Sequence, residues 1–194
     1  MNIFKNNEFE DITFSDIDLS GSDLKNKKFS ECTFNKVNLS NSDLRGSVFI
    51  NCNIADCNLS NPNLEGARLQ GAYFKETKLL GINFCKCFTK LIFDISFDKC
   101  NLLLCFFSDL SLNNKRFTSS VFKECSFAGA KLRKSDFRGS DLKGCDFSNS
   151  DLREADFRDA FNYSINPIDT KIKKAKFSVP EVYSMLTFFE IDLN

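Results

Sequence analysis

Cysteine is the residue type in this sequence with the clearest capacity for site chemistry. The chain has 194 residues, of which nine are cysteine and none is histidine. Cys105, Cys125 and Cys145 are spaced twenty residues apart, and Cys85 and Cys87 form a C-x-C pair. Thiolates are soft ligands, so a row of stacked thiols could bind a soft metal ion.

The rest of the sequence argues against metal binding and catalysis. The absence of histidine removes the commonest general base, the usual partner of a catalytic serine and the favoured nitrogen ligand of zinc. The sequence has no G-x-S-x-G turn and no phosphate-binding loop, and two thiolates alone make a poor zinc site. We therefore expect a protein that is not an enzyme and that has no metal and no cofactor.

Aspartate is the second residue type that could do chemistry, because it recurs directly before a Leu or Phe. The recurring residues are Asp23, Asp43, Asp136, Asp141, Asp151 and Asp156. A carboxylate used in acid–base catalysis is desolvated in a cleft. A regular array of carboxylates beside Arg and Lys is instead typical of an outer surface, so we expect these side chains to point to solvent.

The elements that position these residues follow a period of five. A large apolar residue, here called a centre, recurs in steps of five from Phe4 to Phe84 and from Phe97 to Phe157. A helix repeats its apolar positions every three or four residues and a half-buried strand every two, so this period fits neither. Most of the 23 phenylalanines are centres, so the period governs the chain as a whole.

Two other positions of the repeat carry a constant residue type. A small residue lies two positions before each centre, and seven cysteines occupy this position: Cys32, Cys52, Cys57, Cys100, Cys105, Cys125 and Cys145. A buried thiol behaves as a small hydrophobe there, which explains these cysteines without a metal. All eight glycines lie two positions after a centre, which indicates a recurring corner that needs positive φ.

Centres twenty residues apart tend to be identical, which predicts four repeats per turn of a closed coil. Phe97, Phe117, Phe137 and Phe157 form one such column, and Leu112, Leu132 and Leu152 form another. Turns stacked at the spacing of hydrogen-bonded strands would make a β-solenoid with these centres in its core.

Segments such as SDLRG, SDLKG and ADFRD resemble the pentapeptide-repeat family, whose repeat is A(D/N)LXX, and the match extends over residues 2–161. The resemblance implies an all-β fold, a right-handed quadrilateral β-helix with four five-residue repeats per coil. The chain length and the closing segment are also similar to the quinolone-resistance (Qnr) subgroup. Members of that subgroup bind DNA gyrase and topoisomerase IV, and a C-terminal helix joins two of their solenoids.

The repeat is interrupted at two places. Phe84 and Phe97 are thirteen residues apart, so an irregularity is expected over 85–96. It is either a tolerated defect or a binding loop, for which Cys85, Cys87, Phe88 and Phe93 are the candidate residues. Centres also fail at Asn162 and Pro167 and return at Ile172 and Phe177, which predicts a loop over 162–171.

The chain closes with a helical pattern. Ser178 and Glu181 form a capping-box signature, which predicts a short α-helix that caps the end of the solenoid. Four apolar residues at helical spacing, Val182, Met185, Leu186 and Phe189, are the candidate dimer contact. We therefore predict a solenoid over 1–177, a capping or dimerisation segment over 178–194, and a homodimer.

Composition places the protein in the cytoplasm. The sequence has no run of eighteen apolar residues and no N-terminal signal-peptide pattern, so neither a membrane span nor secretion is expected. Nine cysteines then fit a reducing compartment.

The charge balance bears on which function the protein has, and two alternatives remain. The chain has 26 basic and 26 acidic residues, and residues 127–161 hold seven of each, so we expect neither a basic stripe nor direct binding to nucleic acid. One function is the one that the resemblance implies, a protein that binds DNA gyrase or topoisomerase IV and confers quinolone resistance. The alternative is a scaffold or protein–protein interaction module with another partner, for which mixed-sign surfaces suffice.

Overall fold

The computed structural model describes residues 5–90 and 92–190. Phe4 and the outer ends of the predicted segments 1–177 and 178–194 lie outside these residues. The chain forms two compact units, Met1–Asn101 (unit 1) and Leu102–Asn194 (unit 2).

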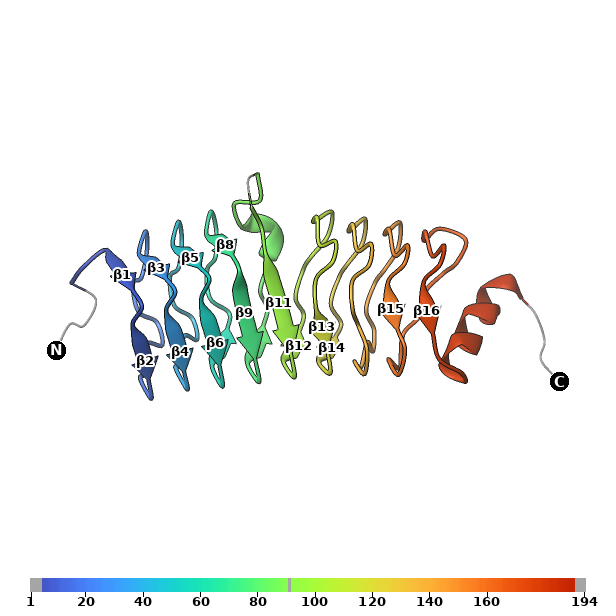
Figure 1. The fold of residues 1–194 in the computed structure, drawn as a ribbon, viewed down its shortest axis with the longest axis horizontal. Helices are drawn as coiled ribbons and strands as arrows, with labels where there is room; N and C mark the ends of the chain where they lie inside the picture. Colours follow the sequence, from blue (N-terminus) through green and yellow to red (C-terminus); the bar gives the residue numbers. More distant parts are fainter. Residues whose placement is uncertain (1–4, 91, 191–194) are drawn as a thin grey trace. The chain divides into compact units, whose positions relative to one another are not determined.

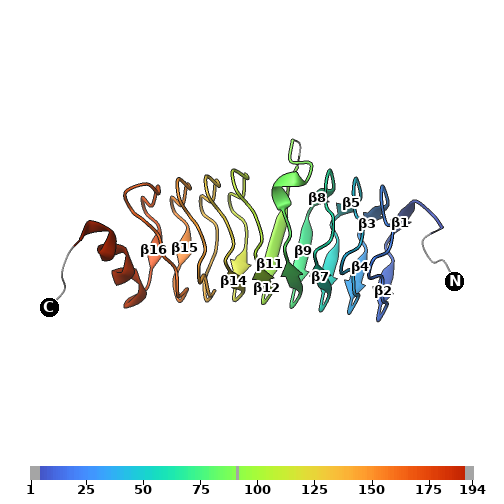
Figure 2. The same ribbon diagram turned by 180° about the vertical axis from the view of Figure 1, so that it is seen from behind.

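Unit 1 consists of coils whose short strands pair in parallel with those of the next coil (Figure 1). One sheet has the order β1-β3-β5-β8, a second contains β2, β4, β6, β9 and β11, and β7 pairs with β10. Figure 2 shows β7 on the side opposite to that seen in Figure 1. The elements are β1 (Glu8–Glu10), β2 (Thr13–Ser15), β3 (Lys28–Ser30), β4 (Thr33–Asn35), β5 (Val48–Ile50), β6 (Asn53–Ala55), β7 (Asn58–Ser60), β8 (Arg68–Gln70), β9 (Ala72–Lys75), β10 (Lys78–Leu80), the 3₁₀ helix η1 (Phe84–Lys86) and β11 (Ile95–Asp98).

The register between coils of unit 1 is twenty residues. Phe9 pairs with Phe29, and Phe29 pairs with Phe49. Because a parallel register places identical positions of the repeat above each other, like side chains stack on like. The predicted fold class, a parallel β-solenoid built from twenty-residue coils, is confirmed.

Unit 2 has the same register with fewer residues in strands. Its coils are joined by isolated parallel bridges such as Asp136↔Asp156 and Lys131↔Asp151. They are also joined by backbone hydrogen bonds, such as that from the Phe137 N–H to the Asp156 carbonyl at 2.8 Å. The elements are β13 (Phe117–Thr118), β14 (Val121–Lys123), β15 (Asp156–Phe157), β16 (Lys176–Phe177) and the 3₁₀ helix η2 (Glu181–Phe189), while β12 (Asn101–Leu103) lies where the two units meet in sequence.

The core of each unit is made of stacked centres. In unit 2 the Phe137 ring stacks on Phe117 at 4.7 Å and on Phe157 at 4.8 Å between centroids. The edges of the same ring meet the rings of Phe127 and Phe147. All the centres of the two columns named above are fully buried: Phe97, Phe117, Phe137, Phe157, Leu112, Leu132 and Leu152. Offset stacking and edge-to-face contact are both favourable for aromatic rings, which accounts for the preference for Phe.

The corners between faces have the positive φ that the glycines indicate. All eight glycines have φ between 64° and 71°. A Cβ at Gly46 would lie 2.4 Å from the Asn26 side-chain oxygen, so a larger residue there would have to displace the Asn26 side chain. Leu104 occupies a corner at φ 54°, an unfavourable conformation for a bulky residue.

The interruption in unit 1 is an insertion of three residues. Phe88 donates its N–H to the Ala67 carbonyl at 2.8 Å, as regular coils do. After the insertion Ile95 pairs with Ala72, a spacing of 23 residues (95 − 72) instead of twenty. The extra residues lie between Phe88 and Asp94, and the four-stranded sheet of unit 1 ends at β8, directly across from them.

The second irregular segment fills the core with residues that the period does not predict. Tyr163 and Ile165 are buried where centres fail. The regular coil resumes afterwards, since the Leu152 N–H donates to the Lys171 carbonyl at 2.8 Å and the Phe177 ring stacks on Phe157 at 5.3 Å.

The predicted short C-terminal helix is confirmed, but its type and its capping box differ from the prediction. The helix η2 is a 3₁₀ helix that begins at Glu181, and its N-cap residue is Pro180, whose side chain makes no capping bond. Ser178 does not cap the helix, because its hydroxyl accepts the Asp159 N–H at 3.1 Å. In both ribbon views η2 follows β16 at the end of unit 2 (Figures 1 and 2).

Removing one ring from the phenylalanine column should destabilise the protein strongly. Phe137→Ala removes two stacking contacts and leaves a cavity, so we expect a loss of about 3–5 kcal/mol in the free energy of unfolding. Asp136→Asn, next to it on the outer surface, should cost much less. Urea denaturation of both variants tests this, and equal losses would contradict the assignment of inward and outward positions.

Candidate functional site

The recurring aspartates have a structural role in the backbone turns. Each accepts a hydrogen bond from the N–H two residues later, as in Lys25 to Asp23 at 3.1 Å and Lys143 to Asp141 at 3.2 Å. This amide lies one position after a centre. A side-chain acceptor of this kind stabilises a turn locally. The sequence reasoning placed these residues at the surface but missed this bond, although the fixed Asp-x-x spacing was a signal for it.

Four of these aspartates also pair with an arginine two residues later. The Arg45 Nε and Nη2 donate to the two Asp43 oxygens at 2.9 and 2.7 Å, and Arg138 does the same to Asp136. The Arg45 guanidinium lowers the pKa of Asp43 to about 2. Bonds from Arg153 and Arg158 likewise lower the pKa of Asp151 and Asp156. A catalytic acid would need the opposite shift, so these carboxylates are fixed anions.

The cysteines are mostly buried thiols. Cys105, Cys125 and Cys145 are buried, and the thiol of Cys125 faces the Leu102 carbonyl at 3.7 Å. Burial raises the pKa of Cys52 to about 11 and of Cys87 to about 12, so neither is a thiolate at neutral pH. Of the C-x-C pair Cys87 is buried and Cys85 is exposed.

These pKa shifts make the stability of the fold depend on pH at both ends of the range. Lowered aspartate pKa values contribute stability above about pH 4 that is lost as the pH falls toward 2. Raised thiol pKa values contribute stability below about pH 8.5 that is lost as the pH rises toward 11. With no histidine in the chain, the melting temperature should be flat from about pH 5 to 8.

Calorimetry across the pH range tests this expectation. The matched variant Asp43→Asn keeps an acceptor for the backbone bond and should weaken the dependence on acid pH. A melting transition that shifts steeply between about pH 6 and 7 would contradict the account, because no group with an ordinary pKa in that range is present.

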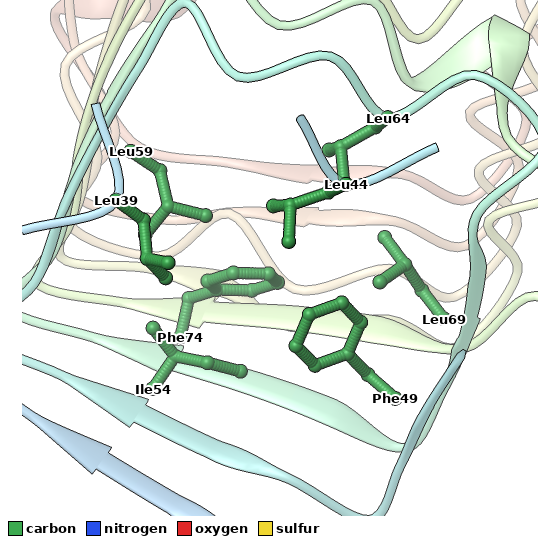
Figure 3. A pocket seen from close by; sticks show the side chains of 8 residues that line it. All are labelled: Leu39, Leu44, Phe49, Ile54, Leu59, Leu64, Leu69 and Phe74. Carbon is green, nitrogen blue, oxygen red and sulfur yellow. The ribbon is translucent and has the colours of Figure 1, made fainter. Parts of the chain in front are cut away.

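The enclosed pocket of unit 1 is a packing gap in the core. It is lined only by apolar centres, Leu39, Leu44, Phe49, Ile54, Leu59, Leu64, Leu69 and Phe74, whose side chains converge in Figure 3. Its volume of about 10 Å³ is no more than one water needs, and none of the lining side chains is polar. The gap lies where Ile and Leu replace the Phe of neighbouring coils, and it is not a ligand site.

The candidate residues of the interruption lie in different environments. Phe88 is half-buried beneath the guanidinium of Arg68, which lies 4.7 Å above the ring centre. Phe93 is half-buried as well, whereas Ile92, which the sequence reasoning did not single out, is 56% exposed. Cation–π contact and partial burial give Phe88 a packing role. The segment therefore presents Ile92 and Cys85 to solvent.

The candidate dimer residues divide between core and surface. Met185 is buried within its own chain, Val182 and Leu186 are half-buried, and Phe189 is 51% exposed. Tyr183 is exposed on the same helix, and sequence reasoning missed it because it lies between the apolar positions. Met185 thus anchors the helix, and Tyr183 and Phe189 are the large side chains that it presents outward.

The side chains of unit 2 form a charged face that the net charge of the sequence does not indicate. We call one surface of unit 2 the basic face. It consists of the outward residues on either side of the centres Leu112, Leu132, Leu152 and Ile172. These residues are Ser111, Asn113, Lys131, Arg133, Asp151, Arg153, Lys171 and Lys173. Five are cationic and one is acidic. The expectation that no basic stripe exists was therefore wrong for this face, because the charges of this half of the chain were summed along the sequence and not sorted by position in the repeat.

The described residues contain neither a cluster of metal ligands nor a helix that could span a membrane. Within residues 5–90 and 92–190 no three acidic, cysteine or histidine side chains lie close enough to hold a metal ion. In the same residues no helix is long and apolar enough to cross a bilayer.

Comparison with known proteins agrees with this geometry. A family model described as pentapeptide repeats matches residues 14–49, 52–88, 100–139 and 120–159. A search of curated proteins gives no match. A trypsin-treated form of QnrB1, a plasmid-mediated fluoroquinolone resistance protein, is similar in fold with a TM-score of 0.62 and 18% identity, over 96% of this chain and 90% of that one. HetL of the cyanobacterium Nostoc sp. strain PCC 7120, involved in heterocyst differentiation regulation, has a TM-score of 0.38 and 17% identity, over 87% and 84%.

Proposed function

This chain belongs to the pentapeptide-repeat family, and on that premise we propose that it is a cytoplasmic binding protein without catalytic activity. The first candidate partner is a bacterial type II topoisomerase, DNA gyrase or topoisomerase IV, with protection from quinolones as the consequence. The observation that carries this proposal is the coil fold, which is similar to QnrB1 over 96% of the chain.

Self-association through the C-terminal helix is part of the proposal. Tyr183, Phe189 and the nearby Val179 are all more than half exposed, so the end of unit 2 presents apolar surface. A second copy of the helix would cover it, since exposed apolar side chains gain free energy when they are buried. Met185 holds the helix on its own chain and leaves this surface facing outward.

One observation favours the alternative, an interaction module without a topoisomerase role. No face of unit 2 has a large excess of acid among its described residues. The outward and corner residues beside Phe107, Phe127 and Phe147 include only two acids, Asp109 and Asp146. Recognition by imitating the negative charge of DNA is therefore not supported for this unit, and binding would rest on shape and hydrogen bonds.

A supercoiling assay with purified DNA gyrase distinguishes the two functions. We expect the protein, titrated with and without ciprofloxacin, to restore supercoiling in the presence of the drug or to inhibit it in its absence. The variant Phe189→Asp places a charge in the proposed dimer contact, so it should sediment as a monomer and act more weakly.

No response at protein concentrations well above that of gyrase would contradict the topoisomerase proposal and leave the interaction module. Monomers for both the unchanged protein and Phe189→Asp would contradict the dimer. The two readouts are separate, so each part of the proposal can fail by itself.

A further inference from the structure

We propose that the basic face of unit 2 binds the phosphate backbone of duplex nucleic acid. This surface is independent of the topoisomerase proposal and of the C-terminal helix. The overall neutrality of the chain does not exclude it, because backbone binding depends on the charge of the contact surface, not on the sum over the molecule.

The charged residues of the basic face lie in two ordered rows, and Asp151 is the one acid among them. Lys131, Asp151 and Lys171 pair in register on successive coils, and form the first row. Arg133, Arg153 and Lys173 form the second, held by the bonds from Lys134 N–H to the Arg153 carbonyl at 3.0 Å and from Glu154 N–H to the Lys173 carbonyl at 3.1 Å. Successive coils are about 4.8 Å apart, so the array is rigid and regular.

The single acid of the face does not offset this charge at the surface. Asp151 accepts bonds from the guanidinium of Arg153, and its side chain is only 15% exposed, against 40% for that of Arg153. Lys131, Lys171 and Lys173 are exposed, and in the described part of the chain none forms an ion pair. The Arg133 guanidinium forms an ion pair at 3.3 Å with the carboxylate of Glu154, which lies at the corner. The charged groups that the basic face exposes to solvent are therefore mainly the ammonium groups of its lysines.

The shape of the face fits an elongated anion. An open groove of about 440 Å³ runs along it, lined by four of its cations, Lys131, Arg133, Arg153 and Lys171, together with Asn113, Asp151 and the corner residues Gly129 and Asn149. The groove is too open to enclose a small ligand, since small-molecule sites bury most of the ligand surface. It suits a partner that lies across several coils.

The chemistry of the outward residues selects the class of polyanion. The face has no aromatic and no large apolar side chain among its outward residues. Protein partners are usually anchored by buried aromatic or apolar groups, and single strands by base stacking on aromatics, so neither fits well. A duplex presents regular phosphates and needs only cationic and hydrogen-bonding side chains.

Fluorescence anisotropy with a labelled mixed-sequence DNA duplex of about two helical turns tests the proposal. We expect a dissociation constant in the micromolar range at about 50 mM salt. With about four phosphates contacted, log K should fall against log salt with a slope of about −3.5. Lys131→Gln with Lys171→Gln should weaken binding about tenfold or more and reduce the slope to about −2.

The matched control is Lys123→Gln with Lys143→Gln, which removes the same charge from another face of unit 2. All four lysines are exposed, so both double variants should have the same melting temperature as the unchanged protein. Lys173→Gln alone is a second, milder variant and should lower the slope by about 0.9. We expect the control to bind DNA within twofold of the unchanged protein.

Four outcomes would overturn the proposal. One is no binding to duplex DNA or duplex RNA up to about 100 µM protein at about 50 mM salt. Another is an equal loss in the two double variants, which would show unspecific attraction. The third is tighter binding to single-stranded DNA than to the duplex. The fourth is tighter binding to polyglutamate or to anionic lipid vesicles, which would assign the face to an acidic protein or a membrane.

Discussion

The structure depends on one constraint, the hydrogen bonding of each coil to the next through backbone groups about twenty residues apart. Every coil presents unpaired N–H and C=O groups along its edges, and a buried polar group without a partner costs free energy. The register satisfies them coil by coil, as in the bond from Leu132 N–H to the Asp151 carbonyl at 2.8 Å. Because the register fixes which side chains stack, the phenylalanine columns, the corners and the outer rows all follow from it.

Because of this constraint, the inward positions of the repeat determine the structure and the outward positions remain free to serve function. The inward positions hold Phe, Leu and small residues, and changes there alter the core. The outward positions carry no packing requirement beyond the turn bond of Asp, so they can vary the charge of a face without changing the coil. The basic face uses this freedom, since Lys131, Asp151 and Lys171 occupy the same position of the repeat on three successive coils.

Much of the fold could be predicted because the five-residue period is directly visible in the sequence. Phe, Leu and Gly at fixed phases predict inward columns and corners, and identity at a spacing of twenty predicts the number of repeats per coil. The insertion was visible as a gap of thirteen between Phe84 and Phe97, but its packing was not, because the contact of Phe88 with Arg68 depends on where the neighbouring coil lies. The burial of Tyr163 and Ile165 was likewise missed, since they fill the core outside the period.

The surfaces were harder to predict than the core. Summing charges along the chain gives neutrality, whereas sorting them by position in the repeat would have shown the excess on the face of Lys131 and Lys171. The helix start was misplaced because Ser178, which has the sequence of a cap, bonds to Asp159 of the preceding coil instead. Local signals of this kind fail when a residue distant in sequence offers a competing partner.

Site-resolved hydrogen exchange of the backbone amides tests the central constraint most directly. The amides of Leu132, Phe137 and Leu152 donate to carbonyls of the next coil, whereas those of Arg138 and Arg153 donate only to the carboxylate of a neighbouring Asp at the surface. We expect slow exchange at the former and fast exchange at the latter, repeated every five residues. Equal protection at both kinds of position, or protection with a helical period, would contradict it.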